Sequence, residues 1–532
     1  MHSNKLISLL IALQFITFAS AQLSSSNLPI VVVTTEDEIP DEPKIEGTIG
    51  IIYDTNGGIN SINDSFNYHS SNLAIETRGN STQGFDKKTY SLELRNLADE
   101  DTSVNLFGMG GEEDWILHAM VIDKSQVRIP MSFHLAQRMG QYASEFKYVE
   151  LILNGDYRGI YILVEKIKRD DDRVDIAKLD EDDLAGDSLT GGYILRMDWL
   201  DDPQGFESNY NSQGGDPMFY QWYYPKAEKI KPQQALYIQD WMGNFEDALF
   251  DNDYTNDQGI RYTEYIDINS FTDFLLINEF SKNSDGYKLS SYVHKDKDSK
   301  GGKLVAGPIW DFDQTYGVSL VCSNNIPTGW TYLQNQDCWD LESMPMWWQN
   351  MMEDPIFQNR LKCRWTSFRQ SFMHTDSIKN WILEDTAYLS EALQRNFEKW
   401  DYFIGESIWI EPDPIPQSYE EEISTMISWI TERLNWMDAN MPGDCSQDDL
   451  SATSLESDDL IRVYPNPTKE KLFIVCPENS KIQLLDLNGN ILMDVISNNG
   501  DTALNVNPLS PGAYFVIIQS HEGIFTQKII RQ

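Results

Sequence analysis

Basic residues are scarce in this chain of 532 residues, in which 41 Lys and Arg stand against 83 Asp and Glu. The formal net charge of −42 argues against a general DNA or RNA binder, because such proteins need a basic face for the phosphates. The same charge argues against docking on an anionic membrane surface. It suits cationic partners or divalent metals.

Long apolar runs are also missing. Beyond the first residues no stretch approaches the roughly 20 apolar residues that span a bilayer, so we expect a mature chain without a transmembrane segment. Residues 1–21 are typical of a secretory signal peptide, with Lys5, an apolar run over Leu6–Phe18 and the A-x-A cleavage site Ala19-Ser20-Ala21. An N-terminal anchor is the alternative, but the run is short for it. We therefore expect export to the periplasm.

Cysteine is rare, and none of the five lies in a C-x-x-C pair of the kind that binds zinc. An exported chain can use its cysteines in disulfides. Cys322 and Cys338 are the nearest pair, and Cys363 could meet Cys445, although the sequence leaves the connectivity open. Cys476 lies in the C-terminal segment.

Apolar residues make up 41% of the chain, which is enough for a large core. Residues 22–46 are polar and contain three prolines, which predicts an extended lead-in. Residues 47–445 form the main body. Residues 446–460 are small, polar and acidic, which indicates a flexible linker to a compact second unit over residues 461–532.

Periodicity predicts an α+β, two-lobed body rather than a doubly wound parallel sheet, because strands with one helix come first and mostly helices follow. The expected strands are Thr48–Tyr53, Leu73–Arg78, Thr89–Leu94, Val149–Leu153, Ile160–Glu165, Gly191–Met197 and Leu289–His294, and the Asn154-Gly155 turn joins the fourth and fifth in a hairpin. The expected helices are Ser125–Met139, Gln233–Phe250, Ile268–Phe280 and, roughly, residues 346–374, 377–402 and 418–441.

Two segments could bind an anionic ligand. In the first, Arg78 opens a turn with two glycines and Ser81 that can cradle an anion, and Lys87 or Lys88 on the next strand can reach phosphate oxygens. The alternative is a hairpin turn with solvated lysines, which the lack of a GxxxxGK[ST] P-loop favours. In the second, Glu165 closes an apolar strand, so its carboxylate needs a ligand or a cation such as Lys166.

Three acids suit catalysis or metal binding. Asp285 lies in a polar loop after an expected helix, where it can serve as a general base or metal ligand, although Asp-Gly turns are common. Asp311 and Asp313 stand at i and i+2, so an extended segment places both carboxylates on one side, able to share Mg²⁺. Without a cation the two charges repel, which favours a metal over pairing with a lysine.

The C-terminal segment alternates as strands over Lys471–Val475, Lys481–Leu485 and Ala513–Ile518, which predicts a small β-sandwich. It resembles the C-terminal sorting domain of the Bacteroidota type IX secretion system (Por). The matching segments are Tyr464-Pro465-Asn466-Pro467, Asp486-Leu487-Asn488-Gly489, Pro511-Gly512-Ala513-Tyr514 and Lys528-Ile529-Ile530. The resemblance implies transport by the type IX machinery, then removal of the tail and release or attachment to the cell surface.

The main body resembles the spore coat protein H (CotH) kinase-like family. The matching segments, in the family's order, are Arg78–Thr82 with Lys87-Lys88-Thr89-Tyr90, Asp123-Lys124-Ser125 with Arg128, Leu163-Val164-Glu165-Lys166, Gly191-Gly192-Tyr193, Asn283-Ser284-Asp285-Gly286, and Trp310-Asp311-Phe312-Asp313 with Gly317. After Gly317 the match is loose.

The resemblance implies an atypical protein-kinase-like fold that uses ATP with Mg²⁺, or Mn²⁺, to phosphorylate Ser or Thr of extracellular proteins. Asp285 would take the catalytic-loop role, and Asp311 with Asp313 the metal role. Arg78, Ser81, Lys87 or Lys88, and Glu165 would contact the nucleotide. The ordinary kinase signatures H-R-D-L-x-x-x-N and G-x-G-x-x-G are absent, so metal-supported positioning would carry the transfer.

Two other functions are compatible with the sequence. One is a catalytically idle surface adhesin that binds a host protein or glycan, for which an aromatic surface around Trp330, Trp339, Trp347 and Trp348 would serve. Core packing is the simpler role for these tryptophans, and an idle scaffold has no need of three clustered acids. The other is a glycoside hydrolase with paired carboxylates, which the order of the motifs fits poorly.

Overall fold

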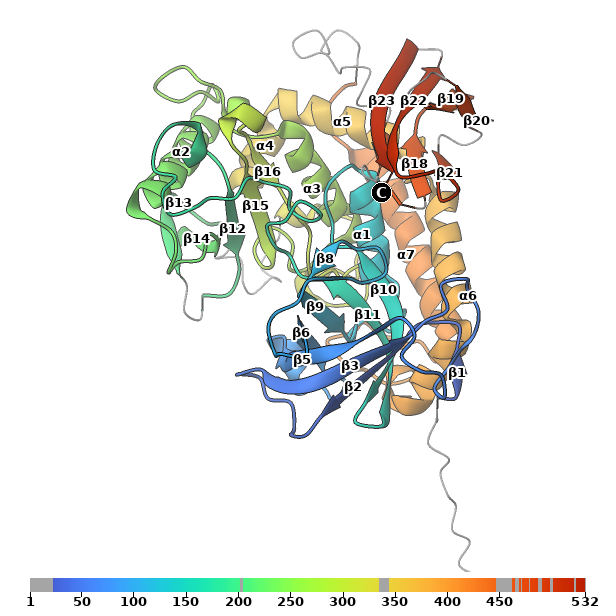
Figure 1. The fold of residues 1–532 in the computed structure, drawn as a ribbon. Coiled ribbons are helices and arrows are strands. Elements are labelled where there is room, and N and C mark those ends of the chain that lie inside the picture. The colour runs from blue at the N-terminus through green and yellow to red at the C-terminus, as the bar shows by residue number, and fades with distance from the viewer. Residues whose placement is uncertain are drawn as a thin grey trace, which may run out of the picture.

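The computed structural model describes residues 23–200, 204–333, 344–445 and, with short gaps, 462–531. The expected signal peptide, the expected linker over residues 446–460, Cys338 and Trp339 lie outside the described residues. The architecture is α+β with an all-β tail (Figure 1). No helix of the described part has the length and apolar character needed to cross a membrane.

The N-terminal part is a closed barrel with the strand order β10-β11-β9-β6-β5-β3-β2. Its neighbours pair in antiparallel fashion, except that β2 closes the barrel by pairing in parallel with β10. The strands are β2 (Ile30–Thr35), β3 (Ile45–Ile52), β5 (His69–Arg78), β6 (Thr89–Arg95), β9 (Asp114–His118), β10 (Phe146–Leu153) and β11 (Asp156–Glu165). Short pairs flank them: β1 (Ser25–Ser26) with β4 (Asn60–Ser61), and β7 (Val104–Asn105) with β8 (Gly111–Glu112).

Strand β2 lies in the segment that we expected to be an extended lead-in. Val31 and Val33 are fully buried in the barrel core, and Val31 pairs with both Ile51 and Leu151. The segment therefore belongs to the folded body. Its flanking prolines are compatible with this, because they stand outside the strand, where no ladder hydrogen bond is lost.

Helix α1 (Arg128–Arg138) connects β9 to β10 and begins three residues later than the spacing predicts. The carboxylate of Asp123 accepts hydrogen bonds from the backbone N–H groups of Ser125 and Arg128 and from the Arg128 guanidinium. These bonds hold residues 123–127 in a turn that precedes the helix.

The central part combines one sheet with six helices among the described residues. The sheet order is β13-β14-β12-β15-β16, formed by β12 (Tyr193–Met197), β13 (Gly205–Asn211), β14 (Pro217–Tyr224), β15 (Ser291–Lys295) and β16 (Leu304–Ala306). The helices are α2 (Pro232–Phe250), α3 (Ile268–Ser281), α4 (Trp347–Glu353), α5 (Pro355–Arg369), α6 (Thr375–Lys399) and α7 (Tyr419–Asn440). Helices α6 and α7 lie side by side, and α6 reaches the barrel, where it packs on β11 (Figure 1).

Aromatic side chains fill the interior of the central part. Trp347 and Trp348 are 1% and 2% exposed and pack on Phe271 of α3, which confirms core packing for these two tryptophans. Trp330 is partly buried against Trp436. They do not form the open aromatic surface that a glycan-binding adhesin would need.

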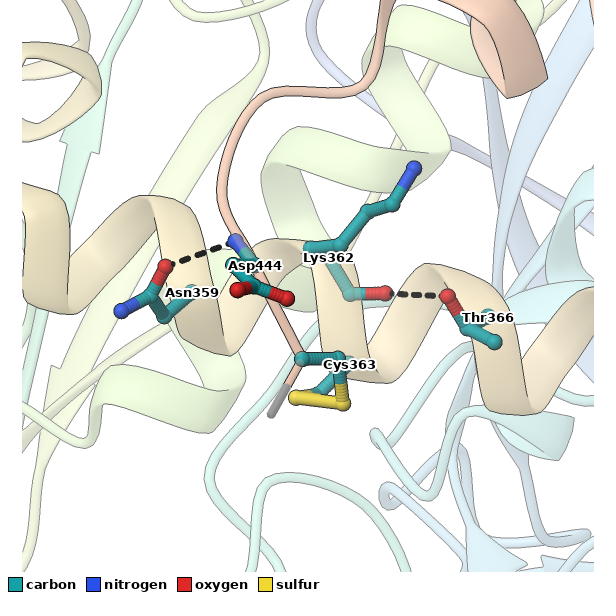
Figure 2. Close-up of a disulfide and its surroundings, with 6 residues drawn as sticks. Asn359, Lys362, Cys363, Thr366 and Asp444 are labelled. Carbon is teal, nitrogen blue, oxygen red and sulfur yellow. Dashed lines mark hydrogen bonds between the residues drawn. A yellow bond between two sulfur atoms is a disulfide. The ribbon is translucent and has the colours of Figure 1, made fainter. Parts of the chain in front are cut away.

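The disulfide between Cys363 and Cys445 confirms the second of the two pairings considered from the sequence (Figure 2). It joins α5 to the segment that follows α7. Beside it, the backbone N–H of Asp444 donates a hydrogen bond to the side-chain oxygen of Asn359, at 2.8 Å. Cys322 is also disulfide-bonded.

The tail forms two antiparallel sheets around a core of its own, which agrees with the β-sandwich expected from the sequence. One sheet has the order β17-β18-β21, and the other has the order β20-β19-β22-β23. Their bounds are β17 (Arg462–Tyr464), β18 (Lys471–Val475), β19 (Lys481–Leu485), β20 (Ile491–Ile496), β21 (Asp501–Asn505), β22 (Gly512–Ser520) and β23 (Gly523–Arg531).

Candidate active site

A cavity of about 730 Å³ lies where the barrel meets the central sheet. The barrel contributes Arg78 and Gly79 from the end of β5, Thr89 from β6 and His118 from β9. The facing wall comes from β12, β14 and β15 and from the loops that carry Asp285, Asp311 and Asp313. The cavity therefore gathers residues that are up to 369 positions apart in the sequence, from Asp41 to Ile410.

Asp285 stands in a loop set by the end of α3. Lys282 adopts a left-handed conformation that stops the helix, and the side-chain oxygen of Asn283 accepts a hydrogen bond from the Asp285 N–H at 3.1 Å. This local bond fixes the loop that brings Asp285 to the cavity.

Asp311 and Asp313 both line the cavity, but they do so by a route that the sequence did not predict. Strand β16 ends at Ala306, and Asp311 has a left-handed backbone with φ of 54°, so the segment is not extended there. The Ser290 hydroxyl donates a hydrogen bond to Asp311 Oδ2 at 2.6 Å. The two carboxylates reach one cavity through a bend rather than through strand alternation.

The three aspartates lie within electrostatic reach of each other. Burial raises the pKa of Asp313 well above its usual value, and the negative charges of Asp311 and Asp285 raise it further. Burial also raises the pKa of Asp311, an effect that the Ser290 hydrogen bond and the positive charge of Arg78 oppose. Neighbouring carboxylates whose charges repel one another, such as those of Asp311 and Asp313, can share a hard divalent cation, which would offset their charge.

A second cluster of acidic residues contacts a lysine of the same chain. In the described part of the chain, the carboxylates of Glu112, Glu113 and Asp114 are a set of three that come within 4.8 Å of one another, whereas those of Asp285, Asp311 and Asp313 do not. Lys168 Nζ lies 2.7, 2.6 and 3.1 Å from Glu112, Glu113 and Asp114. Arg173 and Lys44 add positive charge at 3.6 Å from Glu112 and 3.8 Å from Asp114, so this group needs no metal.

Four cations face the same cavity: Arg78, Lys166, Arg196 and Lys226. Burial lowers the pKa of Lys226, and the positive charges of Lys166 and Arg196 lower it further, so the cations repel one another. Arg196 pairs with Asp198 at 3.2 Å, whereas Lys166 is 3.8 Å from Asp114. The same lining carries seven carboxylates, so a polyanion would bind at these cations together with a metal ion that offsets the acids.

Lys87 and Lys88, two of the lysines expected to reach phosphate, do not line the cavity. Lys87 is fully buried, with Nζ 3.2 Å from Asn396 Oδ1 and 3.5 Å from Gln126 Oε1. Lys88 Nζ donates to the backbone oxygen of Gln83. Ser81 lies in the short 3₁₀ turn Ser81–Gly84.

Glu165 is buried behind the cavity wall rather than in it. Its Oε2 accepts hydrogen bonds from the Tyr142 hydroxyl at 3.0 Å and from the Glu145 N–H at 2.9 Å, and its Oε1 is 3.7 Å from Arg173. Burial raises the pKa of Glu165 to about 8. Its cation partner is therefore Arg173 and not Lys166, the neighbour considered from the sequence.

Sequence reasoning found Arg78 and the three aspartates because each stands in a local motif. It missed four residues from different parts of the fold: His118 of β9, Lys166 after β11, Arg196 of β12 and Lys226 after β14. Lys166 was considered only as a partner of Glu165. Only the tertiary structure shows that these residues share one site, because no sequence motif or regular spacing connects them.

Comparison with known proteins identifies both parts of the chain. The model for "Secretion system C-terminal sorting domain" matches residues 462–532. Such a tail implies secretion or display at the cell surface through the type IX machinery.

No curated protein matches the chain. A solved structure described as PorZ, "an essential bacterial surface component of the type-IX secretion system of human oral-microbiomic Porphyromonas gingivalis", is similar at 18% identity with a TM-score of 0.14. The match covers 15% of this chain and only 12% of that one. A similarity this limited supports no conclusion about fold or function.

The model for "CotH kinase protein" matches residues 75–437, which is more than half of the 532 residues. The match begins at β5 and continues into α7, so it includes the cavity and the helices after Gly317, where the sequence resemblance is loose. The chain belongs to the CotH kinase protein family.

Proposed function

We propose that this protein is a secreted or cell-surface protein kinase that transfers the γ-phosphate of ATP to Ser or Thr hydroxyls of extracellular proteins, with Mg²⁺. The observation that carries the proposal is the cavity, because its lining joins four cations to three aspartates, of which Asp313 is buried and Asp285 and Asp311 are half-buried. One group suits a triphosphate, and the other suits a metal and a base.

The residues take distinct roles in this proposal. Arg78, Lys166, Arg196 and Lys226 bind the anionic phosphates, in place of Lys87 and Lys88. Asp311 and Asp313 would hold Mg²⁺, which neutralises charge on the phosphate oxygens when it is bound. The Ser290 hydroxyl orients Asp311, and the Asn283 side chain orients the loop of Asp285.

Asp285 is the general base of the transfer. The substrate hydroxyl oxygen forms a bond to the γ-phosphorus while the bond from that phosphorus to the bridging oxygen of ADP breaks. The hydroxyl proton passes to the Asp285 carboxylate, which must therefore be ionised before the step. The surrounding positive charges favour binding of ATP over binding of uncharged nucleosides.

Nucleotide binding tests the proposal first. ATP should raise the melting temperature of the purified protein only when Mg²⁺ or Mn²⁺ is present, with a gain of about 2.7 kcal/mol at 100 times Kd. Transfer of ³²P from labelled ATP to the protein itself or to secreted proteins should then depend on Asp285. Asp285→Asn is the control, because it should bind ATP and fail to transfer. If no pairing of nucleotide and metal shifts the melting temperature, the kinase is refuted and a surface-binding protein is supported.

A further inference from the structure

His118 is the last residue of β9 and forms part of the cavity wall on the barrel side. Strand β9 lies between β6 and β11, so its position is fixed by pairing on both sides. Arg78 pairs with Thr89 across β5 and β6, and the Thr89 hydroxyl accepts a hydrogen bond from the Ala119 N–H at 3.0 Å. These contacts hold Arg78 at the end of β5 and His118 at the end of β9, where both residues line the same cavity.

The imidazole of His118 has its tautomer set by the backbone. The N–H of Met120 donates a hydrogen bond to Nδ1 at 3.1 Å, so Nδ1 is the acceptor and the ring proton is on Nε2. Among the described residues, Nε2 has no hydrogen-bond partner, and it is not sealed from solvent. Because the side chain lines the cavity, Nε2 opens into it.

The imidazole is also uncharged at neutral pH. Burial lowers the pKa of His118 to about 3, and the positive charges of Arg78 and Lys87 contribute. A neutral N–H can bind an anionic oxygen without repelling the cations that already crowd this cavity, as another lysine would. A donor of this kind is therefore suited to the space beside Arg78.

We propose that His118 donates a hydrogen bond from Nε2 to a phosphate oxygen of the bound nucleotide, as an uncharged phosphate-binding residue beside Arg78. The inference rests on the proposed function, since it takes the ligand to be ATP. It assigns to β9 a ligand contact that no sequence motif of the chain indicates.

Two substitutions of His118 separate the hydrogen-bond donor at Nε2 from the hydrogen bond that Nδ1 accepts from the Met120 N–H. His118→Asn places its amide oxygen near the Nδ1 position, so it can keep the bond from Met120 but loses the donor at Nε2. His118→Gln places its amide NH₂ near the Nε2 position, so it keeps the donor but loses the acceptor. Melting temperatures without ligand verify that both variants fold.

Binding of ATP and of adenosine to the purified protein, measured by calorimetry with Mg²⁺, tests the contact. We expect His118→Asn to weaken ATP binding about tenfold, the effect of one hydrogen bond to a charged group, and His118→Gln to stay within about threefold of the wild type. Adenosine binding should be the same in all three proteins. Equal ATP affinity of wild type and His118→Asn would overturn the inference, as would an equal loss for adenosine.

Inorganic triphosphate as a second probe distinguishes this inference from the proposed function. If the wild type binds triphosphate in a His118-dependent manner but does not bind ATP, the ATP-dependent kinase is refuted and the phosphate contact stands. If the wild type binds ATP and the Asn variant binds it as well, the kinase stands and the contact is refuted. If the wild type binds neither probe, both are refuted.

Discussion

The backbone conformation and the carboxylate of Asp311 each restrict which residues can replace it. Its φ of 54° lies in the left-handed region, which Asn and Asp tolerate better than most residues. Its carboxylate is close to other buried acids and accepts one hydrogen bond, from Ser290. Within the described residues no cation lies close enough to form an ion pair with it, and the positive charge of Arg78 offsets its charge only in part.

Asp311→Asn should therefore separate metal binding from folding. The amide oxygen can still accept the Ser290 bond, and Asn accepts the left-handed backbone, so the metal-free free energy of unfolding should stay within about 1 kcal/mol of the wild type. Metal-dependent ATP binding and phosphate transfer should fall together, because the charge that holds the metal is gone. Melting without metal and calorimetric titration of ATP with Mg²⁺ measure the two effects.

Alanine is a poor choice at this position, since it would add backbone strain of about 1 kcal/mol or more to the loss of charge. A strongly destabilised Asp311→Asn protein would indicate an ion pair rather than a metal ligand. Full transfer activity in that variant would equally reject the metal role.

Glu165 predicts a pH dependence of stability. Its pKa is raised to about 8 in the folded protein, mainly by burial, against a usual value of 4.5. The folded state thus keeps a proton that the unfolded state loses, so this group's stabilising effect is complete below pH 4.5 and is lost as the pH rises to 8. Glu165→Gln has no ionisable group at this position, so its free energy of unfolding should fall less steeply over pH 5–8 than that of the wild type. The two slopes should differ by up to about 1.4 kcal/mol per pH unit. Urea unfolding at several pH values checks this, and parallel curves for the two proteins would contradict it.

At the scale of elements, Asn396 holds α6 on the barrel together with two ion pairs, from Arg395 to Glu150 and from Lys399 to Asp156. Asn396 Oδ1 accepts hydrogen bonds from the Ile160 N–H of β11 at 3.0 Å and from Lys87 Nζ at 3.2 Å. Gly159 lies directly beside it with φ of 88°, and a Cβ there would come within 2.3 Å of the same oxygen. The contact therefore requires a residue without a side chain in β11.

Gly159→Ala should destabilise the protein by about 2–4 kcal/mol, because it combines left-handed strain with displacement of Asn396. Gly155→Ala is the matched control, since Gly155 has a φ of 79° in the hairpin turn but open space around it. The control should cost about 1 kcal/mol, the backbone part alone. Chemical denaturation of both variants gives the difference, and equal losses would mean that α6 does not depend on this contact.

Elements with strong local signals were predictable from the sequence. The Asn154-Gly155 turn predicted a hairpin, and Leu153 pairs with Asp156 across it. The apolar spacing of α2 predicted that helix to within one residue at its start. Strand β2 was missed because its buried run is short and the prolines and acids around it dominate the composition. Its identity depends on pairing with β10, about 120 residues away, which local reasoning cannot supply.

The residues of the candidate site also fall into those that local sequence patterns indicate and those that only the tertiary structure brings together. Asp285 follows a helix end, and Asp311 with Asp313 forms a compact motif, so residue type and spacing sufficed to select them. The two lysines next to the Arg78 turn were attractive for the same reason, yet folding directs Lys87 toward Asn396 and Gln126. Lys166, Arg196 and Lys226, from segments far apart in the sequence, line the cavity in their place.

For the whole molecule, the distribution of charge matters more than its total. The chain carries −42, so its mean field repels free ATP, yet four cations gather at one cavity. The lining of this cavity also carries seven carboxylates, so attraction of the nucleotide should be strongest when a divalent metal has already reduced the charge of the phosphates. This is the physical reason for expecting nucleotide binding to require metal.

The tail has a hydrophobic core of its own. Its buried side chains, among them Leu472, Ile482 and Val516, form a cluster that does not merge with the cores of the body, so loss of the tail should leave the body folded. We expect the mature extracellular protein to lack residues 461–532, because a sorting domain has no role after transport. Mass spectrometry of the culture supernatant and of the cell surface measures the C-terminus. A chain deleted from residue 461 should stay inside the cell envelope with an unchanged melting temperature of the body. An extracellular protein that still ends at Gln532 would show that the tail is not removed, and normal export of the deleted chain would show that it is not the sorting signal.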